Sequence, residues 1–186
     1  MQDVVAQRQS GLVIVLENMH DPHNAAAVLR SCDAFGVQDV YFIFQNQPPF
    51  DPRKIGKSSS SSAKKWLTYH TFSSTTECLS ELKSQDYTLY GTLCNEHTES
   101  IYSRHIRESK VALLMGNEHS GLSEEAIRML DVAISIPMRG FVQSFNLSVT
   151  AGILLFEITR QRLEQNALVA NGTEYQEKLL ADFLNR

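Results

Sequence analysis

The sequence lacks several features that would assign it to a class at once. It holds only three cysteines, Cys32, Cys78 and Cys94, and no C-x-x-C pair, so neither a zinc site nor a disulfide framework is indicated. No apolar run approaches the roughly 18 residues of a membrane span. The N-terminus has neither the basic start nor the apolar region of a signal peptide. We therefore expect a cytoplasmic protein with no membrane span and no metal.

Glycine-rich phosphate loops are also missing. None of the predicted strands is followed by G-x-G-x-x-G, and no P-loop can be placed. A generic nucleotide-binding α/β protein would be expected to carry one of them. If this chain binds an adenosine ligand, it must hold that ligand by a different arrangement.

An overall excess of basic residues is absent as well. The net charge is −4, which is not typical of a nucleic-acid-binding protein. The distribution is uneven, however, and positions 53 to 65 contain a basic cluster without acidic residues: Arg53, Lys54, Lys57, Lys64 and Lys65. On charge alone, a solvated loop is the favoured interpretation of this basic cluster.

What is present is a regular alternation of apolar strands and helices. Residues 12–16 and 111–115 are predicted strands of the type that parallel sheets bury on both faces, and residues 37–44, 87–93 and 132–136 are further predicted strands. Helices are predicted over residues 24–35, 75–84, 123–130 and 147–165 and from residue 173, with a helical turn at 100–107. Residues 45–62 contain three prolines and five consecutive serines, so we expect them to be mobile and to add little core. The alternation predicts an α/β domain with a mainly parallel sheet and helices on both faces.

Three polar segments interrupt this pattern, each where a predicted strand passes into a helix. They are His23-Asn24 with Arg30, then Gly116-Asn117-Glu118, and then residues 136–146. Ligands of α/β sheets collect at the carboxyl ends of the strands. We therefore expect the three segments to form one composite site.

Most residues of these segments also have a purely structural interpretation. Asn24 is placed to cap its helix, Glu118 lies in an ordinary turn closed by glycines, and Asn146 or Ser148 can cap the next helix. Arg30 is harder to explain, because it lies in a helix of small apolar residues and needs an anionic or polar partner. That partner is either a substrate phosphate or hydroxyl, or an internal carboxylate.

The three segments resemble the ordered motifs of the SpoU/TrmH family of SPOUT RNA methyltransferases. The first motif matches residues 15–24 with Arg30, the second matches residues 113–118 with 121–123, and the third matches residues 136–138, 143–148 and 160–162. The similarity extends from about residue 9 to residue 165. Residues 20–24 and 143–146 are most similar to the TrmH-type tRNA guanosine 2′-O-methyltransferases within that family. Phe145 departs from the pattern, since leucine is more usual there.

The resemblance implies a SPOUT fold over residues 1–165, with a short N-terminal extension and a trefoil knot at the C-terminal end of the domain. Residues 166–186 would then form a helical tail. The family binds S-adenosylmethionine in the knot loops and works as a homodimer with the active site at the interface. The apolar face of the predicted helix at 147–165 is compatible with a dimer contact and equally with a place in the core. The positions that map onto cofactor contacts are Thr92, Leu93, Gly116, Ile136, Met138, Phe145 and Leu147.

The resemblance further implies methyl transfer to a ribose 2′-hydroxyl of tRNA, with a guanosine of the D-loop as the expected target. The implied catalytic residues are Arg30, Asn24, Glu118, Ser144 and Asn146. Arg30 is the residue expected to act on the hydroxyl, either as a base helped by a substrate phosphate and Ser144, or only by positioning phosphate and ribose. Asn24 and Glu118 would orient Arg30 and the RNA, and Asn146 would help to hold the loop and the cofactor.

The implied RNA substrate changes the interpretation of the basic cluster, which becomes a flexible arm for tRNA phosphates. Two alternatives stay open. One is methylation of ribosomal RNA, although related rRNA enzymes usually carry an N-terminal RNA-binding domain and only about ten residues precede the first predicted strand. The other is a catalytically silent RNA-binding module on the same fold, which loss of Arg30, Glu118 or Asn146 would have favoured.

Overall fold

The computed structural model describes residues 1–55, 61–94, 98–165 and 173–186. In this part of the chain, seven strands form one sheet in the order β3-β2-β1-β6-β4-β7-β5, and every strand pair is parallel. This confirms the predicted parallel sheet. The strands are β1 (Gln9–Glu17), β2 (Val37–Ile43), β3 (Thr68–Phe72), β4 (Thr88–Thr92), β5 (Glu99–Ser100), β6 (Val111–Met115) and β7 (Val132–Ser135).

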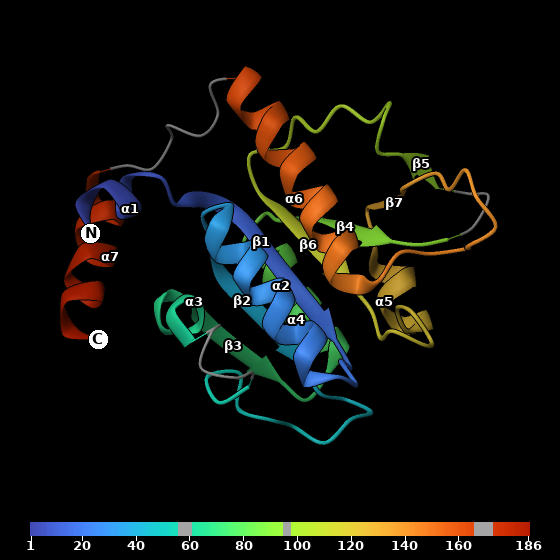
Figure 1. Cartoon of the computed structure of the whole chain (residues 1–186), viewed down its shortest axis with the longest axis horizontal. Coiled ribbons are helices and arrows are strands. Elements are labelled where there is room, and N and C mark those ends of the chain that lie inside the picture. Colours follow the sequence, from blue (N-terminus) through green and yellow to red (C-terminus); the bar gives the residue numbers. More distant parts are fainter. Residues whose placement is uncertain (56–60, 95–97, 166–172) are drawn as a thin grey trace.

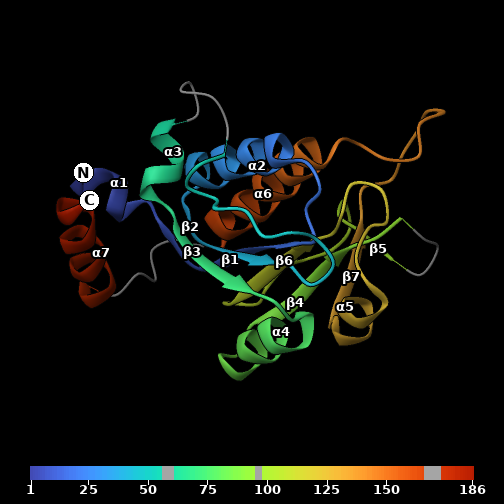
Figure 2. The ribbon, with the colours of Figure 1, turned by 90° about the horizontal axis from the view of Figure 1, so that it is seen from below.

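Helices cover both faces of the sheet (Figures 1 and 2). One face carries α2, α3 and α6, and the other carries α4 and α5. At one end of the molecule, α1 and α7 lie together, and both chain termini lie beside them. The helices are α1 (Gln2–Ala6), α2 (Pro22–Ala34), α3 (Ser61–Trp66), α4 (Thr75–Ser84), α5 (Glu124–Met129), α6 (Leu147–Glu164) and α7 (Thr173–Asn185).

The interior strand β1 is apolar without interruption over residues 12–16 because both of its faces are covered. Leu12, Ile14 and Leu16 belong to the core shared with α2 and α6, whereas Val13 and Val15 belong to the core shared with α4 and α5. Successive side chains of a strand point to opposite faces, so a strand covered on both faces needs apolar residues at every position.

The polar start and the glycine end of α2 follow from local chemistry. Asp21, rather than Asn24, caps the helix, since its carboxylate accepts a hydrogen bond from the His23 amide at 2.8 Å. Pro22 takes the first helical position, where its missing N–H costs nothing. The predicted cap at Asn24 is therefore wrong. The predicted stop is confirmed, because Gly36 follows the helix with φ of +74°.

The helical turn expected at 100–107 is present as a single turn, in which the Ser103 and Arg104 amides both donate to the Ser100 carbonyl at 3.0 Å. It does not continue, in part because the Ile106 amide donates to Gln161 Oε1 at 2.7 Å. The segment at 45–62 supplies more core than expected: Ile55 is buried, and the Phe50 ring packs edge-on against Phe44 at 4.9 Å. The helix α3 begins at the end of this segment and the strand β3 follows it, and neither was predicted.

The terminal helices form a small cluster of their own. Leu179 and Phe183 of α7 are buried against Val5 of α1, with Tyr175 and Trp66 packed beside them. The predicted apolar side of the last helix is thus confirmed. Among the described residues, no helix is both long enough and apolar enough to cross a bilayer.

Candidate functional site

A carboxylate at the carboxyl end of β6 organises the candidate site. β1 and β6 are adjacent and parallel, so the segments that follow them meet at one edge of the sheet. There Glu118 accepts hydrogen bonds from the Asn24 side-chain amide at 3.0 Å, the His20 amide at 3.1 Å and the Asp21 amide at 3.3 Å. The second polar segment therefore fixes the loop that leads into α2.

The third polar segment joins the same network through Asn146. This residue caps α6, as predicted, by accepting from the Ser148 amide at 2.9 Å. Its side-chain amide donates to Asn24 Oδ1 at 3.2 Å. Asn24 thus bridges Glu118 and Asn146, and the composite arrangement expected from the sequence is present in the fold. Asn24 can bridge them because Asp21 has taken over the capping of α2.

The network keeps Glu118 ionised. Partial burial of the carboxyl group would by itself raise the pKa of Glu118, but four hydrogen bonds outweigh it. They come from the Asn24 side chain and from the backbone amides of Glu118, His20 and Asp21, and the resulting pKa is lowered. A fixed negative charge therefore lies at the N-terminal end of α2, where the helix dipole favours it.

Arg30 lies apart from this network. Its side chain is exposed on α2, in line with Ala27 and His23 at spacings of three and seven residues. Within the described residues it makes no hydrogen bond and no ion pair, so the internal carboxylate considered from the sequence is not there. Ser144 is likewise exposed and unbonded in the described structure. The fold thus brings together Asn24, Glu118 and Asn146, and leaves Arg30 and Ser144 free to meet a ligand.

The residues mapped onto cofactor contacts lie at the ends of three neighbouring strands. Thr92 ends β4, Gly116 follows β6, and Ile136 follows β7, and these strands are adjacent in the sheet. The register pairs Thr92 with Ile134 and Gly91 with Leu114, so the three ends lie at one level. Leu93 and Leu147 are half-buried nearby, next to the two main cores.

Gly116 has a clear steric reason to be glycine. A Cβ added there would lie 2.1 Å from the Gly121 carbonyl carbon and 2.2 Å from the Leu122 amide. The turn between them is closed by paired backbone hydrogen bonds of Asn117 and Gly121, each 2.9 Å long. The backbone after β6 is therefore held close and rigid beneath Glu118.

The loop between β7 and α6 has the opposite character. Residues 137–145 form no hydrogen bond with any other residue that the structure describes. Met138 is half-buried, Phe145 is exposed, and Phe141 is more exposed than in an extended peptide. Such a loop offers many unpaired backbone N–H and C=O groups, which are the groups that bind the edge of an adenine and an amino-acid moiety.

Two polar residues of the site were not predicted. Glu17 is buried at the end of β1 and accepts from the Ser123 amide, the Ser123 hydroxyl and the Thr75 hydroxyl at 2.6–2.8 Å. Asn18 has φ of +52°, and its carbonyl accepts from the Asn117 side chain at 2.7 Å. These contacts support the loops that carry Glu118 and His20. A carboxylate directly after a run of five apolar residues was the available signal for Glu17.

The basic cluster is divided between a loop and a helix. Arg53 stacks over Tyr69 and Lys54 pairs with Asp51, whereas Lys64 and Lys65 belong to α3. Lys64 is partly buried and donates to the Ile55 carbonyl, and Lys65 lies over the Trp66 ring at 4.9 Å. Lys57 lies outside the described residues. A flexible arm does not describe the two helical lysines.

Two histidines lie beside the network. The rings of His20 and His119 meet edge to face at 5.8 Å. In the described ranges, no group of three or more His, Cys, Asp or Glu residues is placed to hold a metal ion.

Comparisons with known proteins match this architecture. Residues 11–156 match the model of the SpoU rRNA methylase family. A tRNA (guanosine(18)-2′-O)-methyltransferase from Thermus thermophilus is 36% identical over 189 residues, which cover 100% of this chain and 94% of the relative. A 23S rRNA (guanosine-2′-O-)-methyltransferase, RlmB, from Xylella fastidiosa is 38% identical over 163 residues, which cover 87% of this chain and 64% of the relative.

Two solved structures share the fold. The TrmH/SpoU tRNA modifying enzyme of A. aeolicus superposes with a TM-score of 0.86 at 28% identity, covering 97% of this chain and 91% of that one. The SpoU methyltransferase AviRb from Streptomyces viridochromogenes, solved in complex with AdoMet, gives a TM-score of 0.71 at 27% identity, covering 87% and 61%.

Proposed function

The chain belongs to the SpoU rRNA methylase family, and from this premise we propose that it methylates the 2′-hydroxyl of a guanosine ribose in tRNA, using S-adenosylmethionine. The observation that carries the proposal is the bridge from Glu118 through Asn24 to Asn146, which joins all three family motifs at one edge of the sheet. A guanosine at position 18, the position named for the Thermus relative, is the proposed target.

The extent of the matches favours tRNA over ribosomal RNA. The tRNA enzyme of Thermus aligns over 94% of its own length, whereas the 23S rRNA enzyme of Xylella aligns over 64%. The identities of 36% and 38% do not separate the two substrates. The proposal therefore rests on the whole-length match, and ribosomal RNA is the second candidate.

The residues at the three strand ends fit S-adenosylmethionine. The loop of residues 137–145 offers unpaired backbone groups, and Gly116 lets the backbone after β6 pack closely beside it. When bound, the cofactor would supply a methyl group activated by the positive charge on its sulfur, which becomes a neutral thioether once the C–S bond breaks. The residues that would hold it, mainly through backbone groups and apolar side chains, are Thr92, Leu93, Gly116, Ile136, Met138, Phe145 and Leu147.

Arg30 is the residue proposed to act on the RNA. A ribose hydroxyl is a weak nucleophile, and its proton must leave as the new oxygen–carbon bond forms. The exposed guanidinium of Arg30 is free to bind a phosphate and the ribose. Arg30 either accepts the proton with help from the phosphate and Ser144, or only positions the ribose. In both cases Asn24, Glu118 and Asn146 hold the α2 entry loop and the α6 start in place.

We propose that two copies of the chain assemble through α6. Val149, Phe156 and Leu163 are 46%, 57% and 59% exposed, and their spacing of seven residues puts them on one face of the helix. Exposed apolar faces of this kind mark protein contacts. α2 packs beside α6, so the same interface would bring Arg30 of one copy toward the other copy, as the family resemblance implies.

The fold also supports the proposed trefoil knot and an RNA contact at the basic cluster. β7 lies on the far side of β4 from β6, so the chain after β6 must cross β4 before it enters the loop of residues 137–145. Lys54 and Lys65 are exposed, and phosphate contacts by such residues need no defined sequence. Because the proposed substrate is tRNA, we also propose that the enzyme acts in the cytoplasm.

The decisive experiment incubates the purified protein with labelled S-adenosylmethionine and unmodified bulk tRNA, followed by nucleoside mass spectrometry. The proposal predicts 2′-O-methylguanosine from the wild type and none from Arg30→Ala. Label in ribosomal RNA alone would transfer the assignment to the second candidate. Cofactor binding without transfer to either RNA would contradict the methylation proposal and support the silent RNA-binding module.

A further inference from the structure

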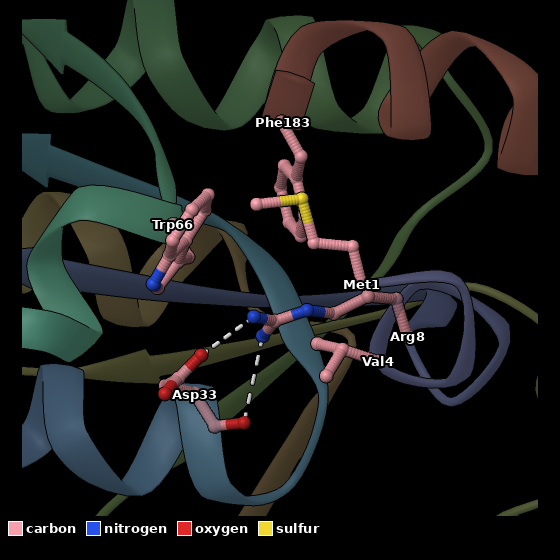
Figure 3. A pocket seen from close by; sticks show the side chains of 6 residues that line it. All are labelled: Met1, Val4, Arg8, Asp33, Trp66 and Phe183. Atoms are coloured by element: carbon pink, nitrogen blue, oxygen red, sulfur yellow. Dashed lines mark hydrogen bonds and ion pairs between the residues drawn. The ribbon is translucent and has the colours of Figure 1, made fainter. Parts of the chain in front are cut away.

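A pocket of about 290 Å³ (Figure 3) lies beside α1 and α7, at the end of the molecule away from the carboxyl end of β1 (Figure 1). It is formed where α1 and α7 meet the start of β1 and the ends of α2 and α3. We call it the terminal pocket, and it is lined by Met1, Val4, Arg8, Asp33, Trp66 and Phe183.

The terminal pocket combines aromatic rings with an ion pair. Trp66 and Phe183 lie 5.1 Å apart, and the Arg8 guanidinium lies over the Phe183 ring at 5.7 Å. Arg8 is buried and pairs with Asp33 Oδ1 at 2.5 Å, whereas the Asp33 side chain is 30% exposed. In Figure 3 the Trp66 ring and this ion pair face the same space. Both an apolar surface and a hydrogen-bond acceptor are therefore presented to a ligand.

These features select one chemical class. A purely apolar ligand would strip water from the Asp33 carboxylate without replacing its hydrogen bonds, which is costly. A small anion would be repelled by the negative charge of the Asp33 carboxylate. A nucleobase satisfies both requirements, because it has a flat face for stacking on an aromatic ring and N–H donors along its edge. Beside the pocket, Lys65 lies over Trp66 at 4.9 Å, where it can bind the adjoining phosphate.

We propose that the terminal pocket receives an unstacked base of the bound RNA on Trp66, an inference that rests on the proposed function. Arg8 precedes β1 and the Glu118 network follows it, and the nine residues of β1 span roughly 30 Å at about 3.3 Å each. A single tRNA is large enough to reach both ends. Binding at the pocket would then depend on the folded shape of the RNA, because the pocket lies far from the methylated ribose.

The chain itself supplies the reporter, since Trp66 is its only tryptophan. Stacking of a base on the indole quenches its fluorescence and shields it from acrylamide. We expect saturating tRNA to quench Trp66 emission in the wild type. Heparin, a polyanion without bases, should leave the emission unchanged. Equal quenching by heparin, or no quenching by tRNA at saturation, would overturn the proposal.

A pair of variants measures the contribution to affinity. Base stacking on an aromatic side chain predicts about tenfold weaker tRNA binding for Trp66→Leu and a change within about threefold for Trp66→Phe. Leu180→Ala, which perturbs the packing of α7 at a residue that does not line the pocket, serves as the control for folding, with thermal melting recorded for each. Equal affinities for Trp66→Leu and wild type would overturn the proposal. Methylation measured in the same samples shows separately whether the proposed function holds.

Discussion

Replacing Asn24 by aspartate tests the network at its central link. The new carboxylate keeps the shape of the side chain and still accepts from the Asn146 amide, but it opposes Glu118 across the 3.0 Å contact where Asn24 now donates. Two unit charges at this distance repel by roughly 5 kcal/mol at an effective dielectric constant near 20. Both side chains are only partly buried, so we take about 2–3 kcal/mol after solvent screening.

If Glu118 and Asn24 must be joined for transfer, this cost appears in the rate. The expected kcat of Asn24→Asp on tRNA at pH 8 is roughly 30- to 150-fold below wild type. Two adjacent carboxyl groups resist double ionisation and take up one proton more readily. The activity of the variant relative to wild type should therefore rise as the pH is lowered from 8 to 6.

Three comparisons make the test specific. Asn24→Ala loses both hydrogen bonds but gains no charge, so it should show no recovery at pH 6. The double variant Asn24→Asp/Glu118→Gln reverses donor and acceptor and should regain part of the rate. Asn46→Asp makes the same charge change at an exposed residue whose side chain lies outside the network, and it should behave as wild type. A wild-type rate for Asn24→Asp at pH 8 would refute the reasoning.

Four shorter predictions follow from other parts of the structure. Arg30→Lys and Arg30→Ala should lose turnover while the free energy of unfolding changes by less than about 0.5 kcal/mol, because the side chain is exposed and unbonded in the described structure; calorimetry beside the methylation assay checks this. Phe156→Glu should yield monomers in sedimentation velocity and lose activity, while Glu164→Gln, on the same helix, should not. Lys54→Glu with Lys65→Glu should weaken tRNA binding and reduce its logarithmic salt slope by about 2, and an unchanged slope would contradict the proposed contact. Hydrogen bonds lower the pKa of Glu118 in the folded state, so its contribution to stability is complete above about pH 4.3 and is lost as the pH falls through the folded pKa; the melting temperatures of wild type and Glu118→Gln should converge in acid.

The sequence predicted the layered architecture because its strands are buried on both faces. Val13 and Val15 face one core, and Leu12, Ile14 and Leu16 face the other. The resulting continuous apolar run is typical of a strand buried on both faces. The edge strand β3 was missed because it is only partly buried and follows a serine-rich segment. Its register is set by pairing with β2, a long-range contact that local sequence does not display.

The sequence predicted that the three polar segments meet, but it did not predict which residues form hydrogen bonds with each other. Asp21 and Asn24 are both good capping residues, and Pro22 at the first helical position favours Asp21 as the cap. Only the folded arrangement shows that Asn24 then turns to Glu118. Glu17 and Asn117 bind groups from distant strands and turns, so their partners follow from the strand order, which periodicity does not determine. The residues that contact a ligand remain predictions.

The place of β1 in the sheet has a consequence for synthesis on the ribosome. One edge of β1 pairs with the nearby β2, but the other pairs with β6, with Leu12 opposite Val111. About 100 residues must be translated before that second partner exists, which takes roughly 5–20 s at about 5–20 residues per second. During this interval an apolar strand has one open edge, which is prone to pair with other chains. We expect nascent chains that end before β6 to bind chaperones, and the Glu118 network to be among the last parts of the enzyme to form.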